Sequence, residues 1–327
     1  MQKDRRRCVL SKIRESKLKN RILARGGFWS DVFRDRQLYL MMLPFLAFYI
    51  LFMYVPMYSL QIAFRNFRFT DGITGSEWVG LSNFVRFFND PWFWRIFRNT
   101  LLISLYGILW GFPIPIALAI LLNEVKRKRL RSAFQTSVLI PHFVSVVVMA
   151  GIVRQIVALE AGLVNNIITF FGGDRINFLI EPGWFRTIFV TMTQWQAVGF
   201  ASIIYLAAIA GIDQQLYEAA VIDGANKWKQ IKHVTLPGIL PTFVILFIMG
   251  IGNVLNVGFE AVMLLITDVT RETGEIINTW VIRVGIQSAP PNQSLATAVG
   301  LFNGLVGLCL VIAANYTSRK LTESALW

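Results

Sequence analysis

Six long apolar stretches constrain the fold of this chain more than any other feature of its sequence. Each exceeds the roughly 17 residues that a helix needs to cross a bilayer. A segment inside lipid must also satisfy its own backbone hydrogen bonds, which favours helices. Pro113, Pro115 and Pro141 predict kinks in the second and third stretches, because proline removes a helix hydrogen bond. We therefore expect an all-α, polytopic membrane protein with six transmembrane helices, at residues 38–62, 98–123, 133–157, 187–212, 240–266 and 295–317.

The charge of the chain agrees with a membrane protein better than with a nucleic-acid-binding one. Hydrophobic residues make up 55% of the sequence, and the net charge is +13. Most of the positive excess lies in the first 36 residues and in residues 126–129, beside apolar spans. This placement is typical of topology determinants, whereas nucleic-acid binding requires a basic face on a folded domain. We expect membrane lipid as a partner, and no nucleic acid.

The distribution of Lys and Arg predicts the orientation. With both termini in the cytoplasm, the cytoplasmic segments hold 22 basic residues and the external segments hold 9, as the positive-inside rule requires. The expected parts are a basic cytoplasmic segment at 1–36, a transmembrane domain at 37–320 and a cytoplasmic tail at 321–327. The aromatic residues among the charges of the first segment fit an interfacial helix, although a disordered tail also fits residues 1–25.

A polar island at residues 213–241 separates the fourth and fifth apolar stretches, and the orientation places it in the cytoplasm. Its first part has helical character up to Gly224, a residue suited to end a helix. A second helix-length stretch runs from Ala225 to Val234, before Pro237 and Pro241. The pattern predicts a helix–turn–helix across the cytoplasmic face, in which small residues let another surface approach closely. A loop that only joins two spans remains the alternative.

The island resembles the EAA motif of bacterial ABC importer permeases. That motif has Glu-Ala-Ala, three residues, Gly, nine residues, an aliphatic residue, one further residue and Leu-Pro. In carbohydrate importers the glycine of this motif stands in the sequence Asp-Gly-Ala, as it does at residues 223–225 here. Val234 stands where Ile is usual, and Ile231 stands where many members have Phe. The matching residues, which the resemblance assigns to coupling with an ATPase, are Glu218, Ala219, Ala220, Asp223, Gly224, Ala225, Leu236 and Pro237.

The resemblance covers nearly the whole chain, from about residue 35 to residue 320. Residues 80–84, 87–91 and 99–101 are similar to the segment before the second span of sugar permeases. Residues 39–44 and 54–58 resemble the first span of a subgroup that handles oligosaccharides and polysaccharide fragments, which includes an alginate importer subunit. The match is specific for the family and weak for the substrate, so an acidic, alginate-like substrate is one option.

The resemblance implies a multi-pass permease subunit in the bacterial inner membrane, which moves an oligosaccharide or polysaccharide by alternating access. Its implied partners are a second permease, expected to be a different chain, two ATP-binding cassette subunits and an extracytoplasmic solute-binding protein. ATP and magnesium would be bound by the partner ATPase subunits, with no cofactor in this chain.

Catalytic and metal-binding patterns are missing from the sequence. No Gly-x-x-x-x-Gly-Lys-Ser/Thr phosphate loop occurs. His142 and His233 have no partners at metal-ligand spacing, and no Ser/His/acid arrangement is readable. We therefore expect neither an enzyme nor a metal site. A stand-alone secondary transporter of a polar solute remains the alternative, but it would need coupling-ion sites and often has inverted repeats. The sequence has no visible repeat.

Polar side chains inside the spans are candidates for the substrate pathway, because such groups are costly in lipid. Amides can satisfy sugar hydroxyls in pairs, and aromatic rings can stack on sugars. The spacing of three and four residues predicts that Asn253, Asn256 and Glu260 share one helix face. Interhelical hydrogen bonding is the alternative for each. Gln194 and Gln196 are about 200° apart on a helix and cannot both line one path. The full candidate set is Asn253, Asn256, Glu260, Gln194, Trp195 and Asn303.

Overall fold

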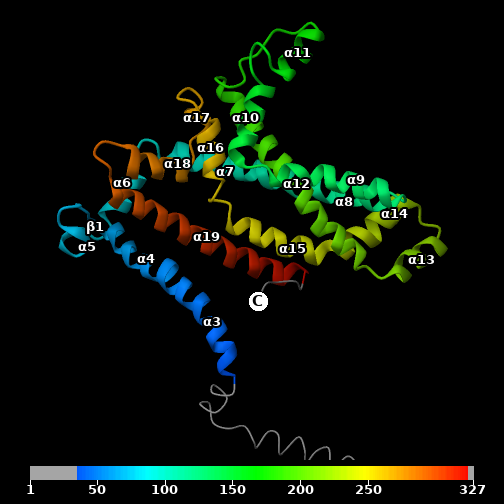
Figure 1. Ribbon diagram of the computed structural model, residues 1–327, viewed down its shortest axis with the longest axis horizontal. Coiled ribbons are helices and arrows are strands. Elements are labelled where there is room, and N and C mark those ends of the chain that lie inside the picture. The colour runs from blue at the N-terminus through cyan, green and yellow to red at the C-terminus, as the bar shows by residue number, and fades with distance from the viewer. Residues whose placement is uncertain (1–34, 323–327) are drawn as a thin grey trace, which may run out of the picture. The chain divides into compact units, whose positions relative to one another are not determined.

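The computed structural model describes residues 35–322, and the chain divides into two compact units between Leu60 and Gln61. The predicted segments 1–36 and 321–327 lie mostly outside the described residues. The described part of the first unit is helical throughout, and none of its side chains is buried. It comprises α3 (Arg36–Tyr49), the π-helical η1 (Ile50–Tyr54) and α4 (Val55–Met57) (Figure 1). The following η2 (Tyr58–Phe64) leads into the second unit.

The second unit begins with a small external substructure. Strands β1 (Arg65–Asn66) and β2 (Glu77–Trp78) pair in antiparallel fashion around α5 (Gly72–Gly75). Helix α6 (Ser82–Phe88) then buries Phe87 against the ring of Trp280, at 5.6 Å between centroids. Phe87 and Phe93 thus form part of a packed core, whereas Trp78 and Trp94 are exposed.

Five helices in residues 35–322 are long and apolar enough to cross a membrane, and a bent pair of helices makes a sixth span if counted as one. The all-helical polytopic fold is therefore confirmed. The second span consists of α7 (Phe93–Gly111) and α8 (Pro113–Glu124), which meet at Phe112, as the two prolines predict. The fourth is η4 (Pro182–Trp184) with α12 (Phe185–Ala210), and the sixth is α19 (Gln293–Thr322).

The third span is broken where Pro141 predicts a kink. Helix α9 (Lys128–Leu139) and the 3₁₀ turn η3 (Ile140–Phe143) form its first half. Helix α10 (Val146–Ile156) follows at a bend of 103°. Gln196 Nε2 donates to the carbonyl of Val144 at 2.7 Å, and Ser145 Oγ caps α10 by accepting from the amide of Val148 at 3.3 Å. Side chains therefore satisfy backbone groups that the break sets free.

The fifth span is also broken, and here the prediction of one helix over 240–266 is wrong. Helix α15 (Leu236–Gly252) ends early, residues 253–258 are non-helical, and α16 (Phe259–Leu265) follows. Glycine and asparagine favour helix ends, and both occur here, at Gly252 and at the C-cap Asn253. The carbonyl of Val254 accepts from the hydroxyl of Ser104.

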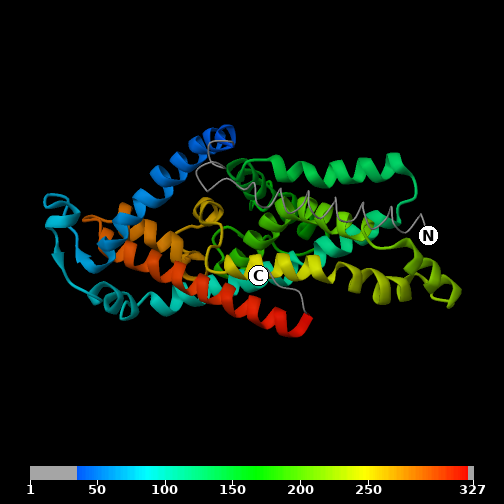
Figure 2. The same cartoon turned by 90° about the horizontal axis from the view of Figure 1, so that it is seen from below.

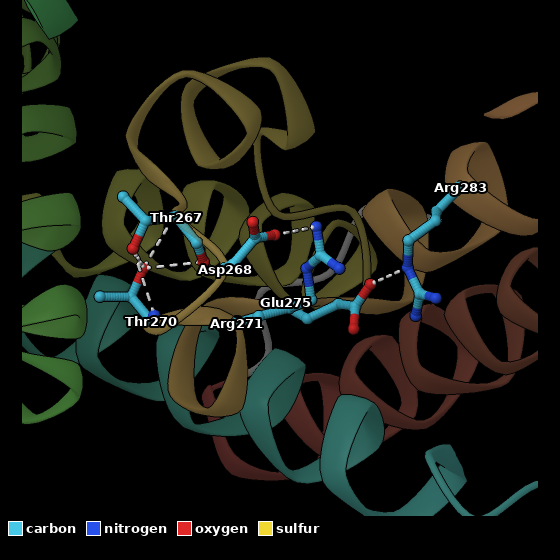
Figure 3. A network of polar contacts seen from close by, with 6 residues as sticks. All are labelled: Thr267, Asp268, Thr270, Arg271, Glu275 and Arg283. Atoms are coloured by element: carbon cyan, nitrogen blue, oxygen red, sulfur yellow. Dashed lines mark hydrogen bonds and ion pairs between the residues drawn. The ribbon is translucent and has the colours of Figure 1, made fainter. Parts of the chain in front are cut away.

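Short external helices complete the unit: α11 (Leu163–Phe170), α17 (Arg271–Gly274), α18 (Ile277–Ile282) and the π-helical η6 (Arg283–Gln287). Figure 3 shows the ion pairs that hold the segment from Thr267 to Arg283. Asp268 pairs with Arg271 at 2.9 Å, and the buried Glu275 pairs with Arg283 at 2.7 Å.

Helix α12 is the centre of the packing. It contacts α7, α8, α9, α10, α15 and α16. Its outer half, with Phe189 and Met192, lies in a buried cluster with α10 and α16. Its inner half, with Tyr205 and Ile209, lies in another with α8 and α15. Helices α15 and α19 run side by side (Figures 1 and 2).

A prediction follows from the close approach of α12 to α9. A Cβ atom on Gly199 would collide with the backbone carbonyl of Val138, which cannot move aside without shifting α9. We expect Gly199→Val to destabilise the protein by about 1–3 kcal/mol or more, as overpacking does, seen as a lower midpoint of thermal unfolding in detergent. Gly300→Ala, where a Cβ meets no atom within 4 Å, is the control. Equal midpoints for the two variants would contradict the close packing.

Candidate functional site

The break in the fifth span separates the three residues predicted to share a helix face. Asn253 is the C-cap of α15, Asn256 lies in the non-helical segment, and Glu260 lies in the first turn of α16. The single-face prediction is therefore wrong, because the helix ends before the three positions are reached. All three side chains are exposed on this chain, so they remain available to a ligand or a partner.

A cluster of three asparagines joins the break to its neighbours. Asn303 of α19 is buried, and its Nδ2 donates to Asn256 Oδ1 at 3.0 Å and to Asn278 Oδ1 at 3.1 Å. Asn278 Nδ2 lies 3.4 Å from Asn256 Oδ1. Asn303 also lies 3.4 Å from the carbonyl of Leu255, while its own Oδ1 has no partner in the structure. Asn303 thus fixes the exposed amide of Asn256 and the half-buried amide of Asn278, and it supports the broken backbone.

Asn278 was missed by the sequence analysis. It lies in α18, outside every apolar stretch, so hydropathy gave no reason to place it near a span. Only the folding of the external segment back onto α19 brings Asn278 to Asn256. The chain offers no sequence signal for this contact.

Gln194 and Asn253 line the same hollow, of about 290 Å³, between α7, α12 and the end of α15. Gln194 Nε2 donates to the carbonyl of Gly107 at 3.2 Å. Glycines on both sides of the hollow leave room for it, at positions 107, 111, 250 and 258. The structure therefore brings together two candidates from different spans.

Trp195 does not join this group. It lines a larger hollow of about 570 Å³ with Tyr106, Trp110 and Arg186, and this hollow shares Gln194 with the smaller one. Gln196 points elsewhere again, toward Val144, as the predicted angle between the two glutamines requires. Of the predicted pathway residues on α12, Trp195 thus lines only the larger hollow, and Gln194 lines both.

The polar island forms its predicted helix and turn. Helix α13 (Gln214–Ile222) is capped by Asp213, whose carboxylate accepts from the amide of Gln215 at 2.9 Å. Gly224 has φ 73°, and the amides of Gly224 and Ala225 donate to the carbonyls of Val221 and Ala220 at 3.0 and 2.8 Å. This is a Schellman motif, so Gly224 ends the helix as predicted.

The second helix of the island is not a separate element. Helix α14 (Lys227–Gln230) continues through the π-helical η5 (Ile231–Thr235) into α15, which carries Leu236 and Pro237 in its first turn. The π-helical turn η5 lies just before Pro237. Proline has no amide hydrogen, so a regular α-helix would lose a backbone hydrogen bond at this point. Tyr217 Oη lies 3.0 Å from Thr235 Oγ1 and ties α13 to this continuous helix.

The island presents an apolar surface with charged neighbours. Ile222 is 86% exposed and Trp228 79% exposed, while Glu218 and Ala219 are exposed beside them. A hollow of about 490 Å³ opens between α13 and the end of α8. Lys227 Nζ lies 3.1 Å from a carboxylate oxygen of Glu124 in that hollow. Exposed apolar patches of this kind typically mark interaction surfaces.

Comparisons with known proteins identify the family. Residues 111–323 match the family described as "Binding-protein-dependent transport system inner membrane component". The chain is 42% identical to the polygalacturonan/rhamnogalacturonan transport system permease protein YteP of Bacillus subtilis (strain 168), over 90% of this chain and 91% of YteP. It is 28% identical to the arabinooligosaccharides transport system permease protein AraP of the same organism, over 92% and 94% of the two chains.

A solved structure agrees over almost the same length. It is the crystal structure of a bacterial ABC transporter involved in the import of the acidic polysaccharide alginate. One of its chains is 42% identical to this chain, with a TM-score of 0.84, and the match covers 91% of this chain and 100% of that one. The chain therefore belongs to the binding-protein-dependent transport system inner membrane components: it is a multi-pass inner-membrane permease of an ABC importer, which is not itself catalytic and relies on a separate ATPase.

Proposed function

We propose that this permease imports oligosaccharides or polysaccharide fragments, including fragments that carry uronic acids. The observation that carries the proposal is the identity of 42%, over about nine tenths of the chain, to a polygalacturonan/rhamnogalacturonan permease and to a chain of an alginate importer. Polymers of this kind display many hydroxyl groups, and the amide cluster at the break of the fifth span supplies the planar donors and acceptors that hydroxyl groups need.

The break itself supports a pathway at this position. Non-helical backbone at membrane depth is tolerated only where protein buries it or where it lines a water-filled cavity. Asn256 is exposed within the break, and the buried Asn303 donates a hydrogen bond to its side chain. Asn253 and Gln194 line the adjoining hollow, and Glu260 follows in α16. We assign the sugar path to the side of α12 that faces these residues. Asn278 joins the predicted set of pathway residues, and Trp195 is left out of it.

The proposed assembly contains a second, different permease chain, two ATP-binding cassette subunits and an extracytoplasmic solute-binding protein. A crystal structure of the alginate transporter holds a periplasmic protein with bound alginate pentasaccharide, and this supports such a delivery step here. The exposed apolar surface of α13 and α14 is the proposed docking face for an ATPase subunit. ATP-driven movement of that face would shift the spans between two arrangements.

The first test is uptake of the proposed substrate. The complete importer in proteoliposomes should accumulate labelled trigalacturonate when ATP is enclosed with its ATPase subunits, and should not do so without ATP. The chain reconstituted alone should be inactive. Uptake by this chain without any ATPase partner would instead identify a secondary transporter.

The second test concerns the coupling turn. Gly224→Trp places a side chain on a residue with φ 73° at the proposed docking face. We expect uptake to fall at least about tenfold, equivalent to about 1.4 kcal/mol, while membrane insertion is unchanged and ATP hydrolysis continues uncoupled. Gly172→Trp is the matched control, because Gly172 has φ 82° but lies in the external segment after α11. Normal uptake in Gly224→Trp would refute the coupling role.

The third test concerns the amide cluster. Asn303→Leu removes the buried donor that holds Asn256 and Asn278, so both amides lose the hydrogen bond that fixes their orientation. We expect the KM for trigalacturonate to rise about tenfold, with assembly intact, and Asn256→Leu and Asn278→Leu to act in the same direction. Asn166→Leu changes an exposed asparagine of α11 and serves as control. Unchanged kinetics in all three cluster variants would reduce these residues to packing.

A further inference from the structure

The larger hollow between α7 and α12 shares Val190 and Gln194 with the smaller hollow beside Asn253, but the rest of its lining on α12 is different. Thr187, Thr191, Trp195 and Val198 form one stripe of α12 that lines it. Phe189 and Thr193, which line the smaller hollow beside Asn253, lie roughly half a turn away from the centre of this stripe. Most of the larger hollow of about 570 Å³ therefore lies outside the proposed sugar path.

Arg186 is the charged group of this hollow, and its positive charge is not neutralised. Its guanidinium donates to Asn99 Oδ1 at 2.8 Å and to the carbonyl of Thr273 at 3.3 Å, and both acceptors are neutral. Arg98 on α7 adds a second positive charge within electrostatic reach. No ion pair of Arg186 with a carboxylate occurs in the described part of the chain. A guanidinium has five donor hydrogens, so donors remain for an anion.

The hollow has a charged group at one end and apolar side chains at the other, with Thr191 and Gln194 on α12 between them. Arg186 lies in the first turn of α12, at the outer end of the fourth span when both termini are cytoplasmic. Tyr106 and Trp110 follow on α7, and the lining ends at Ile114 and Val198. Tyrosine and tryptophan are enriched where headgroups meet acyl chains. A sugar would leave its hydroxyl groups unpaired against Ile114 and Val198, whereas a phospholipid has a charged head and an apolar tail in this order.

We propose that this hollow binds a phospholipid of the outer leaflet, with the headgroup phosphate on Arg186 and an acyl chain along Trp110, Ile114 and Val198. Of the residues that line it, only Val190 and Gln194 also line the hollow beside Asn253. Neutral hydrogen bonds to Asn99 and Thr273 orient Arg186, and Arg98 favours a lipid with net negative charge. The lipid supplies the anion that an arginine at this depth requires.

The test uses the full-length chain in nanodiscs that contain phosphatidylglycerol and phosphatidylcholine, with retained lipid counted by native mass spectrometry. We expect the chain to retain phosphatidylglycerol, and Arg186→Gln to retain it about tenfold less, because a charged hydrogen bond is lost. Arg95→Gln is the matched control. Arg95 lies on the same outer part of α7 and stacks on Trp92, outside the hollow. Equal retention by wild type, Arg186→Gln and Arg95→Gln would overturn the proposal.

Two further measurements separate the remaining possibilities. Trp110→Ala leaves Arg186 in place and removes an exposed ring from the hollow, so it should also lower retention even if Arg186→Gln folds poorly. Unchanged retention in Trp110→Ala would overturn the proposed path of the acyl chain. Added trigalacturonate should not displace the lipid. Displacement from wild type that is absent in Arg186→Gln would assign Arg186 to the carboxylate of the transported sugar and overturn the lipid site.

Discussion

The rest of this structure depends on one requirement, which is that the carbonyl oxygens set free at two broken spans find hydrogen-bond donors. A helix that ends inside a bilayer leaves backbone acceptors that lipid cannot satisfy. Gln196 supplies a donor to Val144 in the third span. Ser104 and Asn303 supply donors to Val254 and Leu255 in the fifth. These donors come from α12, α7 and α19, so neighbouring spans satisfy the carbonyl oxygens that each break sets free.

The two breaks are also joined by packing. Val144 and Val257, one at each break, lie against the same buried cluster. Beyond the breaks, α10 and α16 contact each other and contact α12 through residues such as Met149, Phe189 and Val262. Helix α12 therefore holds both breaks in place from one side. A change in the direction of either outer segment would disturb the packing of the other, because the interior is close-packed.

Much of this architecture could be predicted from the sequence, and the exceptions have physical causes. Hydropathy located the spans, Pro141 located the break of the third span, and Gly224 located the end of α13. The hydropathy profile stays apolar across residues 253–258, because Val254, Leu255 and Val257 are as apolar as the residues of a membrane helix. The profile therefore gave no sign of the second break. The contacts of Asn278 and of Gln196 depend on tertiary structure. No local pattern encodes them.

The continuity of α14, η5 and α15 has a mechanical consequence. Residues 227–252 form one helix, which at 1.5 Å per residue is a rod roughly 39 Å long. Tyr217 fastens α13 to its cytoplasmic part, and its far end stops at Asn253. In the proposed coupling, this rod would act as a lever between the turn at Gly224 and the non-helical segment 253–258. A tilt applied at Lys227 would then be carried along one helix to the asparagine cluster at its far end.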